Sequence, residues 1–178
     1  MMQILLLQLN PTSDQQKLLL ETMRAFNAAA NYVAAIAFAE HTASKVTLQQ
    51  VAYSDLRSRF HLPAQLAIRA ISEACEAYKR DKSRMPFFQS EGGVVYDGRI
   101  MSFKGLMMVS LLTLAGRAHV HFRIVGSRQA HVDSLPGRAD LRYVGGIFML
   151  EVVSTEAWTN ALQDESIPAR AWESSRVM

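Results

Sequence analysis

The chain is poor in cysteine: Cys75 is the only one among 178 residues. A single cysteine cannot form a disulfide within the chain, and it cannot supply the several thiolates of a structural zinc site. The composition therefore predicts a protein of a reducing compartment, and we expect it to be cytoplasmic. Cys75 itself lies within a helical pattern and is expected to be a small buried side chain.

Long hydrophobic runs are also missing. The apolar start of the chain, from Ile4 to Leu7, is too short for a signal peptide and has no basic flank. No apolar run reaches the length needed to cross a bilayer. We therefore expect no contact with a membrane.

Catalytic motifs are a third absence. The sequence contains no G-x-x-x-x-G-K-[ST], no G-x-S-x-G and no H-E-x-x-H. Its 16 acidic residues form no spaced pair or triad of the kind that two-metal nucleases need. His119 and His121 share one face of a predicted strand, but no cysteine or carboxylate completes a metal site. Asp97, in an apolar setting, is expected to pair with Arg99 or to cap a turn. We therefore expect no enzyme activity, no metal and no cofactor.

Positive charge is concentrated in one part of the chain. The formal net charge is +3, yet residues 79–142 carry eleven Lys or Arg and five Asp or Glu, whereas residues 1–78 carry six of each. A regional basic excess is typical of proteins that bind a polyanion. An ordinary solvated surface would have the same composition, so charge alone leaves both interpretations open.

The chain opens with a strand and a long helix. Residues 2–9 form a short apolar run, read as a buried strand. Residues 11–16, Pro-Thr-Ser-Asp-Gln-Gln, are typical of a capped helix start with Thr12 or Ser13 as the cap. Apolar residues then recur at alternating steps of four and three, which predicts one helix to about His41.

Two further helices follow. Residues 47–50, Thr-Leu-Gln-Gln, repeat the capping pattern before a second helix, and Pro63 suits the first turn of a third. The third helix ends in a basic cluster of Lys79, Arg80, Lys82 and Arg84. Cations stabilise the carboxyl end of a helix, and they also bind phosphate, so the cluster has a structural and a functional interpretation.

After residue 93 the hydrophobic period changes to two, which is typical of strands. Five segments show it, at residues 94–103, 108–114, 117–124, 140–144 and 147–154. A first strand separated from its sheet by helices implies an insertion. We therefore predict an α+β fold: a small antiparallel β-barrel of residues 1–10 and 94–155, with a three-helix insertion, residues 11–93, after its first strand. Residues 156–178 have no clear period and are expected to form an irregular tail.

Six short motifs follow one another between residues 3 and 153. They are Leu9-Asn10-Pro11-Thr12 with Gln15 and Phe26-Asn27-Ala28-Ala29-Ala30-Asn31; Tyr53-x-x-Leu56-Arg57-x-x-Phe60-x-Leu62-Pro63-Ala64-Gln65; Ala77-Tyr78-Lys79; Tyr96-Asp97-x-Arg99-Ile100-x-Ser102-Phe103; Val109-Ser110-Leu111-x-Thr113-Leu114-x-Gly116-Arg117; and Phe148-x-Leu150-x-Val152. In this order they resemble the start of the TnpB family, transposon-encoded RNA-guided nucleases related to compact type V CRISPR effectors.

The resemblance implies a wedge-like barrel related to oligonucleotide-binding folds, with the helices as a recognition lobe. In the family these parts hold a guide RNA and its heteroduplex with target DNA. Cutting belongs to a later RuvC-like domain that begins with Gly-x-Asp-x-Gly, where this chain reads Ile167-Pro-Ala-Arg-Ala-Trp172. We therefore expect the nucleic-acid-binding part of such a nuclease, without its cutting part.

The resemblance also implies a set of contact residues. The family places a DNA-reading Gln at the start of the third helix, where Gln65 stands, and Gln can bond an adenine edge through two hydrogen bonds. A plain surface residue is the other interpretation of Gln65. The expected phosphate contacts are Arg57, Arg59, Arg69, Lys79, Arg80 and Lys82.

Two other functions remain open from the sequence. The chain could be an inert or protein-interaction remnant of a disrupted transposon gene, pairing with other subunits through the Ala-rich helix at residues 28–39. It could also be one half of a split nuclease, with the catalytic acids on a RuvC-bearing partner polypeptide.

Overall fold

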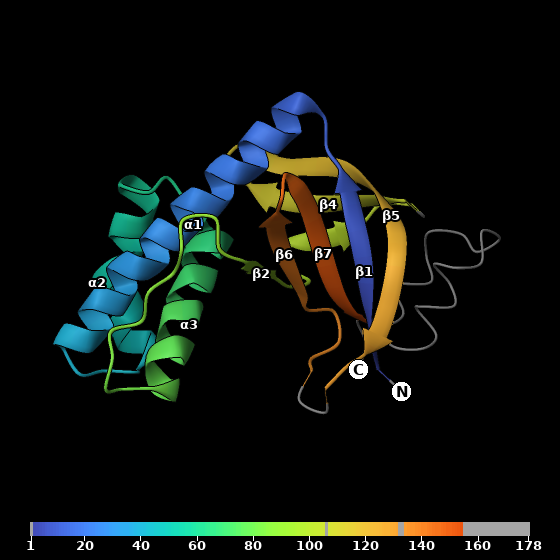
Figure 1. Cartoon of the computed structure of the whole chain (residues 1–178). Coiled ribbons are helices and arrows are strands. Elements are labelled where there is room, and N and C mark those ends of the chain that lie inside the picture. The colour runs from blue at the N-terminus through green and yellow to red at the C-terminus, as the bar shows by residue number, and fades with distance from the viewer. Residues whose placement is uncertain (1, 106, 132–133, 155–178) are drawn as a thin grey trace. The chain divides into compact units, whose positions relative to one another are not determined.

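The computed structural model describes residues 2–105, 107–131 and 134–154, and the predicted tail at 156–178 lies outside them. The elements are β1 (Gln3–Asn10), α1 (Ser13–Ala39), α2 (Lys45–Ser58), α3 (Ala64–Arg80), β2 (Val94–Tyr96), β3 (Met101–Phe103), β4 (Met108–Thr113), β5 (Gly116–Gln129), β6 (Ala139–Val144) and β7 (Ile147–Ser154) (Figure 1). The chain divides into a barrel unit, within residues 1–16, 95–112 and 117–178, and a helical unit of residues 17–94 and 113–116.

The strands form one seven-stranded sheet in the order β2-β6-β7-β1-β5-β4-β3. β1 lies at its centre and pairs antiparallel with both β5 and β7. β2 and β3 stand at opposite ends of this order but follow each other in sequence, so the short link between them brings the two edges together into a nearly closed barrel. The predicted fold class, an antiparallel barrel with three helices after its first strand, is confirmed.

The prediction of a single strand over residues 94–103 is wrong, because a tight turn divides it into β2 and β3. The backbone carbonyl of Asp97 accepts hydrogen bonds from the N–H groups of Ile100 and Met101, at 3.1 and 2.9 Å. The Asp97 side chain also accepts one from the N–H of Arg99, at 2.9 Å. Asp97 therefore caps a turn, as one of the two sequence interpretations held, and this turn moves the chain from one edge of the sheet to the other.

β5 is longer than predicted and is irregular in the middle. Leu6 of β1 faces Gly126, but the next residue, Leu7, faces Ile124, so Val125 is an extra residue without a partner in β1. Such a bulge bends a strand and increases its twist. The bulge therefore lets a 14-residue strand follow the curved wall of a small barrel.

Helix starts were predicted with mixed success. The N–H of Gln15 donates to Thr12 Oγ1 at 3.2 Å and the N–H of Thr12 donates to Gln15 Oε1 at 3.0 Å, so the expected capping box at the start of α1 is confirmed. α2 begins earlier than predicted, because Ser44 is its cap and accepts from the N–H of Thr47. Pro63 precedes α3 as its cap residue instead of lying in its first turn.

The helical unit has an apolar core to which all three helices contribute. The predicted face of α1 is buried throughout: Leu19, Met23, Phe26, Ala30, Val33 and Ala37. Cys75 of α3 is buried as expected, and its thiol donates to the carbonyl of Ala43 at 2.7 Å. Among the described helices, none is both long and apolar enough to cross a membrane.

Candidate nucleic-acid interface

The residue expected to read DNA lies at the turn between α2 and α3. Gln65 is the second residue of α3, and its side chain is exposed. Nearby in the chain, Arg57 is exposed in the last turn of α2 and donates to the carbonyl of Leu62 at 3.3 Å. The end of α2 and the start of α3 thus each present one exposed polar side chain, the guanidinium of Arg57 and the amide of Gln65.

Arg59 lies in an aromatic environment at the end of α2. Its guanidinium carbon is 5.0 Å from the centre of the Tyr32 ring and 5.9 Å from that of Phe60. The Tyr32 hydroxyl donates to Asp55, and this hydrogen bond is the main reason that the pKa of Tyr32 is raised. A guanidinium held against aromatic faces keeps its charge and its exposed N–H donors while losing little freedom on binding.

Arg69 differs from the other predicted phosphate contacts. It forms an ion pair with Glu73, one turn further along α3, and the two side chains are only 13% and 15% exposed. A carboxylate already balances this guanidinium, and a phosphate would have to compete with it. Arg69 is therefore less accessible to a nucleic acid than the exposed cations.

The remaining cations form a basic run at the other end of α3. Its members, all exposed, are Lys79, Arg80, Lys82 and Arg84. Asp81 is the acid among them, and it accepts hydrogen bonds from the backbone and the hydroxyl of Ser83, which lower its pKa. At 1.5 Å per residue, Arg80 lies about 22 Å along the helix from Gln65. The predicted contacts thus form two groups at opposite ends of α3.

The two asparagines of the Phe-Asn-Ala-Ala-Ala-Asn motif hold the chain that follows the basic run. The amide of Asn31 exchanges two hydrogen bonds with the backbone of Phe88, and the buried amide of Asn27 donates to the carbonyls of Ser90 and Gly92, at 3.3 and 2.9 Å. Residues 85–92 therefore run along α1 (Figure 1). Sequence reasoning placed Phe26 and Ala30 of this motif on the buried face of α1 but assigned the two asparagines no structural role.

Residues 85–92 also bring apolar side chains to the surface beside the basic run. Phe87 is 76% exposed and Met85 is 52% exposed. Sequence reasoning missed both. The available signal was the composition Arg-Met-Pro-Phe-Phe directly after a cluster of cations, because single-stranded nucleic-acid sites combine aromatic and basic residues.

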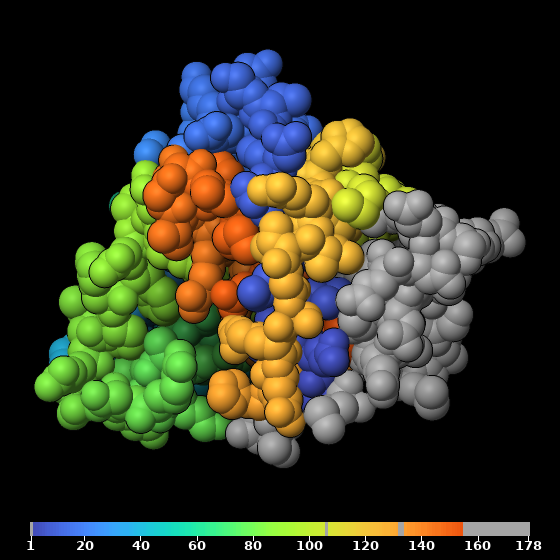
Figure 2. Space-filling model, turned by 45° about the vertical axis from the view of Figure 1, so that its right-hand side comes forward, coloured from blue at the N-terminus to red at the C-terminus, as the bar shows by residue number. Residues whose placement is uncertain are grey.

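The barrel unit carries a second basic surface on β5. Arg117, His119, His121 and Arg123 are exposed, while Ala118, Val120 and Phe122 between them are buried. Arg117 donates to the carbonyl of Arg99 at 2.8 Å, and Arg123 donates to Gln8 Oε1 at 2.8 Å. β5 lies along the face shown in Figure 2, where it is drawn in amber. Sequence reasoning considered the two histidines only as a possible metal pair and found no third ligand for them. Among the described residues, no group of three or more His, Cys, Asp or Glu could hold a metal.

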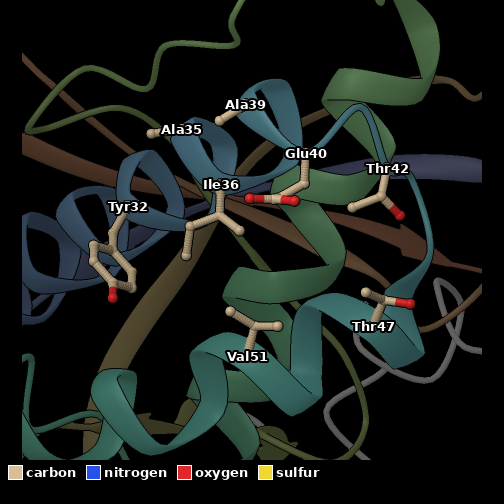
Figure 3. Close-up of a pocket in the computed structure, with 8 residues that line it drawn as sticks. All are labelled: Tyr32, Ala35, Ile36, Ala39, Glu40, Thr42, Thr47 and Val51. Carbon is tan, nitrogen blue, oxygen red and sulfur yellow. The ribbon is translucent and has the colours of Figure 1, made fainter.

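A pocket of about 680 Å³ opens between α1 and α2 in the helical unit. Its lining residues are Tyr32, Ala35, Ile36, Ala39, Glu40, Thr42, Thr47 and Val51, and Figure 3 shows Ile36 of α1 facing Val51 of α2. The lining is mostly apolar and its one carboxylate, on Glu40, disfavours a polyanion. This pocket therefore does not extend the basic surfaces.

Comparisons with models of known protein families and with curated proteins found no match to the chain.

Proposed function

We propose that residues 2–154 are the nucleic-acid-binding part of a TnpB-like RNA-guided DNA endonuclease or transposase-associated protein, and that they bind guide RNA and target DNA without cutting. The observation that carries this proposal is the basic run at the end of α3. It places four exposed cations within six residues, and the single acid among them is engaged by Ser83. Phosphate contacts of this kind supply most of the affinity for a nucleic acid.

The fold supports the same proposal. A barrel with a helical insertion is the architecture that the TnpB resemblance implies, and Arg117 and Arg123 give the barrel unit exposed cations of its own. In RNA-guided systems the protein holds the duplex by its backbone, and base pairing selects the sequence. A protein of this kind needs cations and few base contacts, and Gln65 is the base contact that we propose.

The proposal is tested by direct binding. The full chain is titrated against a labelled single-stranded RNA, a DNA duplex and an RNA–DNA heteroduplex at low salt, with its fold checked by circular dichroism. We expect binding that weakens steeply as salt is raised, because counterions are released from the phosphates. A folded chain that binds none of the three at low salt contradicts the proposal.

The pocket between α1 and α2 favours a second candidate function, the binding of another protein. Its apolar floor and the exposed Val51, at 56%, suit a protein side chain better than a phosphate. That partner could be the polypeptide that carries the RuvC acids. Val51→Asp separates the two functions, because it would weaken a protein complex captured by size-exclusion chromatography and leave the affinity for RNA and DNA nearly unchanged.

A further inference from the structure

Phe87 projects from a segment with a regular pattern of exposure. Along residues 85–89 the side chains alternate: Met85, Phe87 and Gln89 are exposed, and Pro86 and Phe88 are partly covered. Alternation of this kind places successive side chains on opposite sides of an extended chain. Phe88 thus faces the helical unit, and the ring of Phe87, at 76% exposed, faces away from it.

The backbone directly after this ring is held by a side chain of α1. Asn31 Nδ2 donates to the carbonyl of Phe88 at 2.8 Å, and the Phe88 N–H donates to Asn31 Oδ1 at 2.7 Å. Further along, Arg24 forms an ion pair with Glu91 at 2.6 Å. A ligand that binds the Phe87 ring would therefore order little additional backbone, which lowers the entropic cost of binding.

The charge around the ring is positive. Arg84 is three residues before Phe87, so its Cα lies within about 11 Å of that of Phe87 even in a fully extended chain. Lys82 lies two residues before Arg84 and is exposed as well. The Asp81 carboxylate accepts hydrogen bonds from the N–H and the hydroxyl of Ser83. An exposed aromatic face beside exposed cations has the two elements that single-stranded nucleic-acid sites combine, a stacking platform and phosphate contacts.

We propose that Phe87 is the stacking platform for an unpaired base of a single-stranded nucleic acid, and that Lys82 and Arg84 contact the phosphates next to that base. This inference rests on the proposed nucleic-acid-binding function and assigns it a site that the TnpB motifs do not contain. The exposed apolar surface consists of two side chains, Met85 and Phe87, which is little for a protein interface or for insertion into a bilayer. The excess of cations matches a polyanion.

The experiment compares oligomers that differ only in their bases. The full chain and the variants Phe87→Ala and Phe87→Tyr are titrated with labelled oligo(dT), with oligo(U), and with an abasic DNA strand of equal length, which keeps the phosphates and lacks the bases. Val46→Ala is the matched control, because Val46 is a comparably exposed apolar residue, at 69%, on a helix without a basic run. Each titration is repeated over a range of salt concentrations.

We expect Phe87→Ala to weaken binding of oligo(dT) and oligo(U) by about 5- to 100-fold, the range found for removal of one stacking aromatic. Binding of the abasic strand should change by less than about twofold, the salt dependence should be unchanged, and Phe87→Tyr should restore wild-type affinity. Equal loss on oligo(dT) and oligo(U) means that any unpaired strand is accepted, and loss on oligo(U) alone assigns the site to RNA.

The inference is overturned if Phe87→Ala binds all strands as the wild type does, or if it weakens the abasic strand equally. In the first of these results the wild type still binds, so the proposed function stands without this site. Binding of no strand by the folded wild type removes both proposals. If Phe87→Ala instead reduces binding to anionic lipid vesicles while oligo(dT) binding is unaffected, the ring contacts a membrane and the inference is wrong.

Discussion

The side-chain amide of Asn31 pairs with the backbone of Phe88, donating to its carbonyl and accepting from its N–H. This is the hydrogen-bond pattern that a neighbouring strand would supply, provided here by one side chain of α1. We expect Asn31→Ala to destabilise the protein by about 1–3 kcal/mol, because it leaves a partly buried donor and acceptor without partners. Urea denaturation measures the change, and hydrogen exchange should show faster exchange of the Phe88 amide.

Asn31→Asp is the control for this prediction. At neutral pH the carboxylate of this variant keeps the acceptor for the Phe88 N–H and loses the donor to the Phe88 carbonyl. At low pH the protonated carboxyl has both a donor and an acceptor. The variant should then lose no more unfolding free energy than Asn31→Ala does. A free energy of unfolding for Asn31→Ala within about 0.5 kcal/mol of wild type would mean that water replaces both bonds.

The helices and most strands could be predicted because their signals are local. The face of α1 from Leu19 to Ala37 and the Thr12–Gln15 cap follow from residues within a few positions of one another. The break between β2 and β3 was missed, although Asp97-Gly98 is a turn signal and a turn cap was one of the two interpretations of Asp97. The distinction arises from the partners: β2 pairs next to β6 and β3 next to β4, at opposite ends of the sheet.

The candidate site was predicted in part for the same reason. Lys79, Arg80 and Lys82 are adjacent in sequence, so their shared exposure at the end of α3 could be expected. The engagement of Arg69 by Glu73 and the stacking of Arg59 on Tyr32 depend on how the helices pack. Periodicity places a residue on a face of its helix, but it does not show what lies against that face.

Cys75 gives a direct report on unfolding of the helical unit. Its thiol is buried and donates to the carbonyl of Ala43, and burial raises its pKa. A raised pKa lowers the thiolate fraction at neutral pH, and the thiolate is the reactive form. We expect a disulfide reagent to modify the native protein far more slowly than the urea-unfolded protein, measured by release of the coloured thiol. Equal rates in the two states would show that α3 opens readily in the native protein.

Salt dependence tests the basic run. Neutralising Z phosphates of duplex DNA gives a slope of log affinity against log salt of roughly −0.9Z, so each lost contact should flatten the slope by about one unit. We expect Lys79→Ala, Arg80→Ala and Lys82→Ala in combination to flatten the slope by about two to three units, roughly one for each lost contact. Lys17→Ala removes an exposed cation of α1 outside the run and should leave the slope nearly unchanged. An unaltered slope in the triple variant would place the phosphates elsewhere, with Arg117 and Arg123 of β5 as the next candidates.

Gln65 should behave in the opposite way. A side chain that bonds a base edge releases no counterion, so we expect Gln65→Ala to leave the salt slope unchanged while weakening binding to the preferred DNA sequence by about 1–3 kcal/mol. The fold should tolerate the change, because Gln65 is exposed and Ala is the best helix former. Gln50→Ala is the matched control, since Gln50 is an exposed glutamine of α2. The wild type and both variants are each mixed with a pool of duplexes whose sequence next to the target is randomised. The measurement is the affinity of each protein for the preferred duplex in competition with that pool. If Gln65→Ala selects the same sequence with the same affinity, Gln65 is a surface residue of α3, and the choice of DNA sequence depends on other side chains.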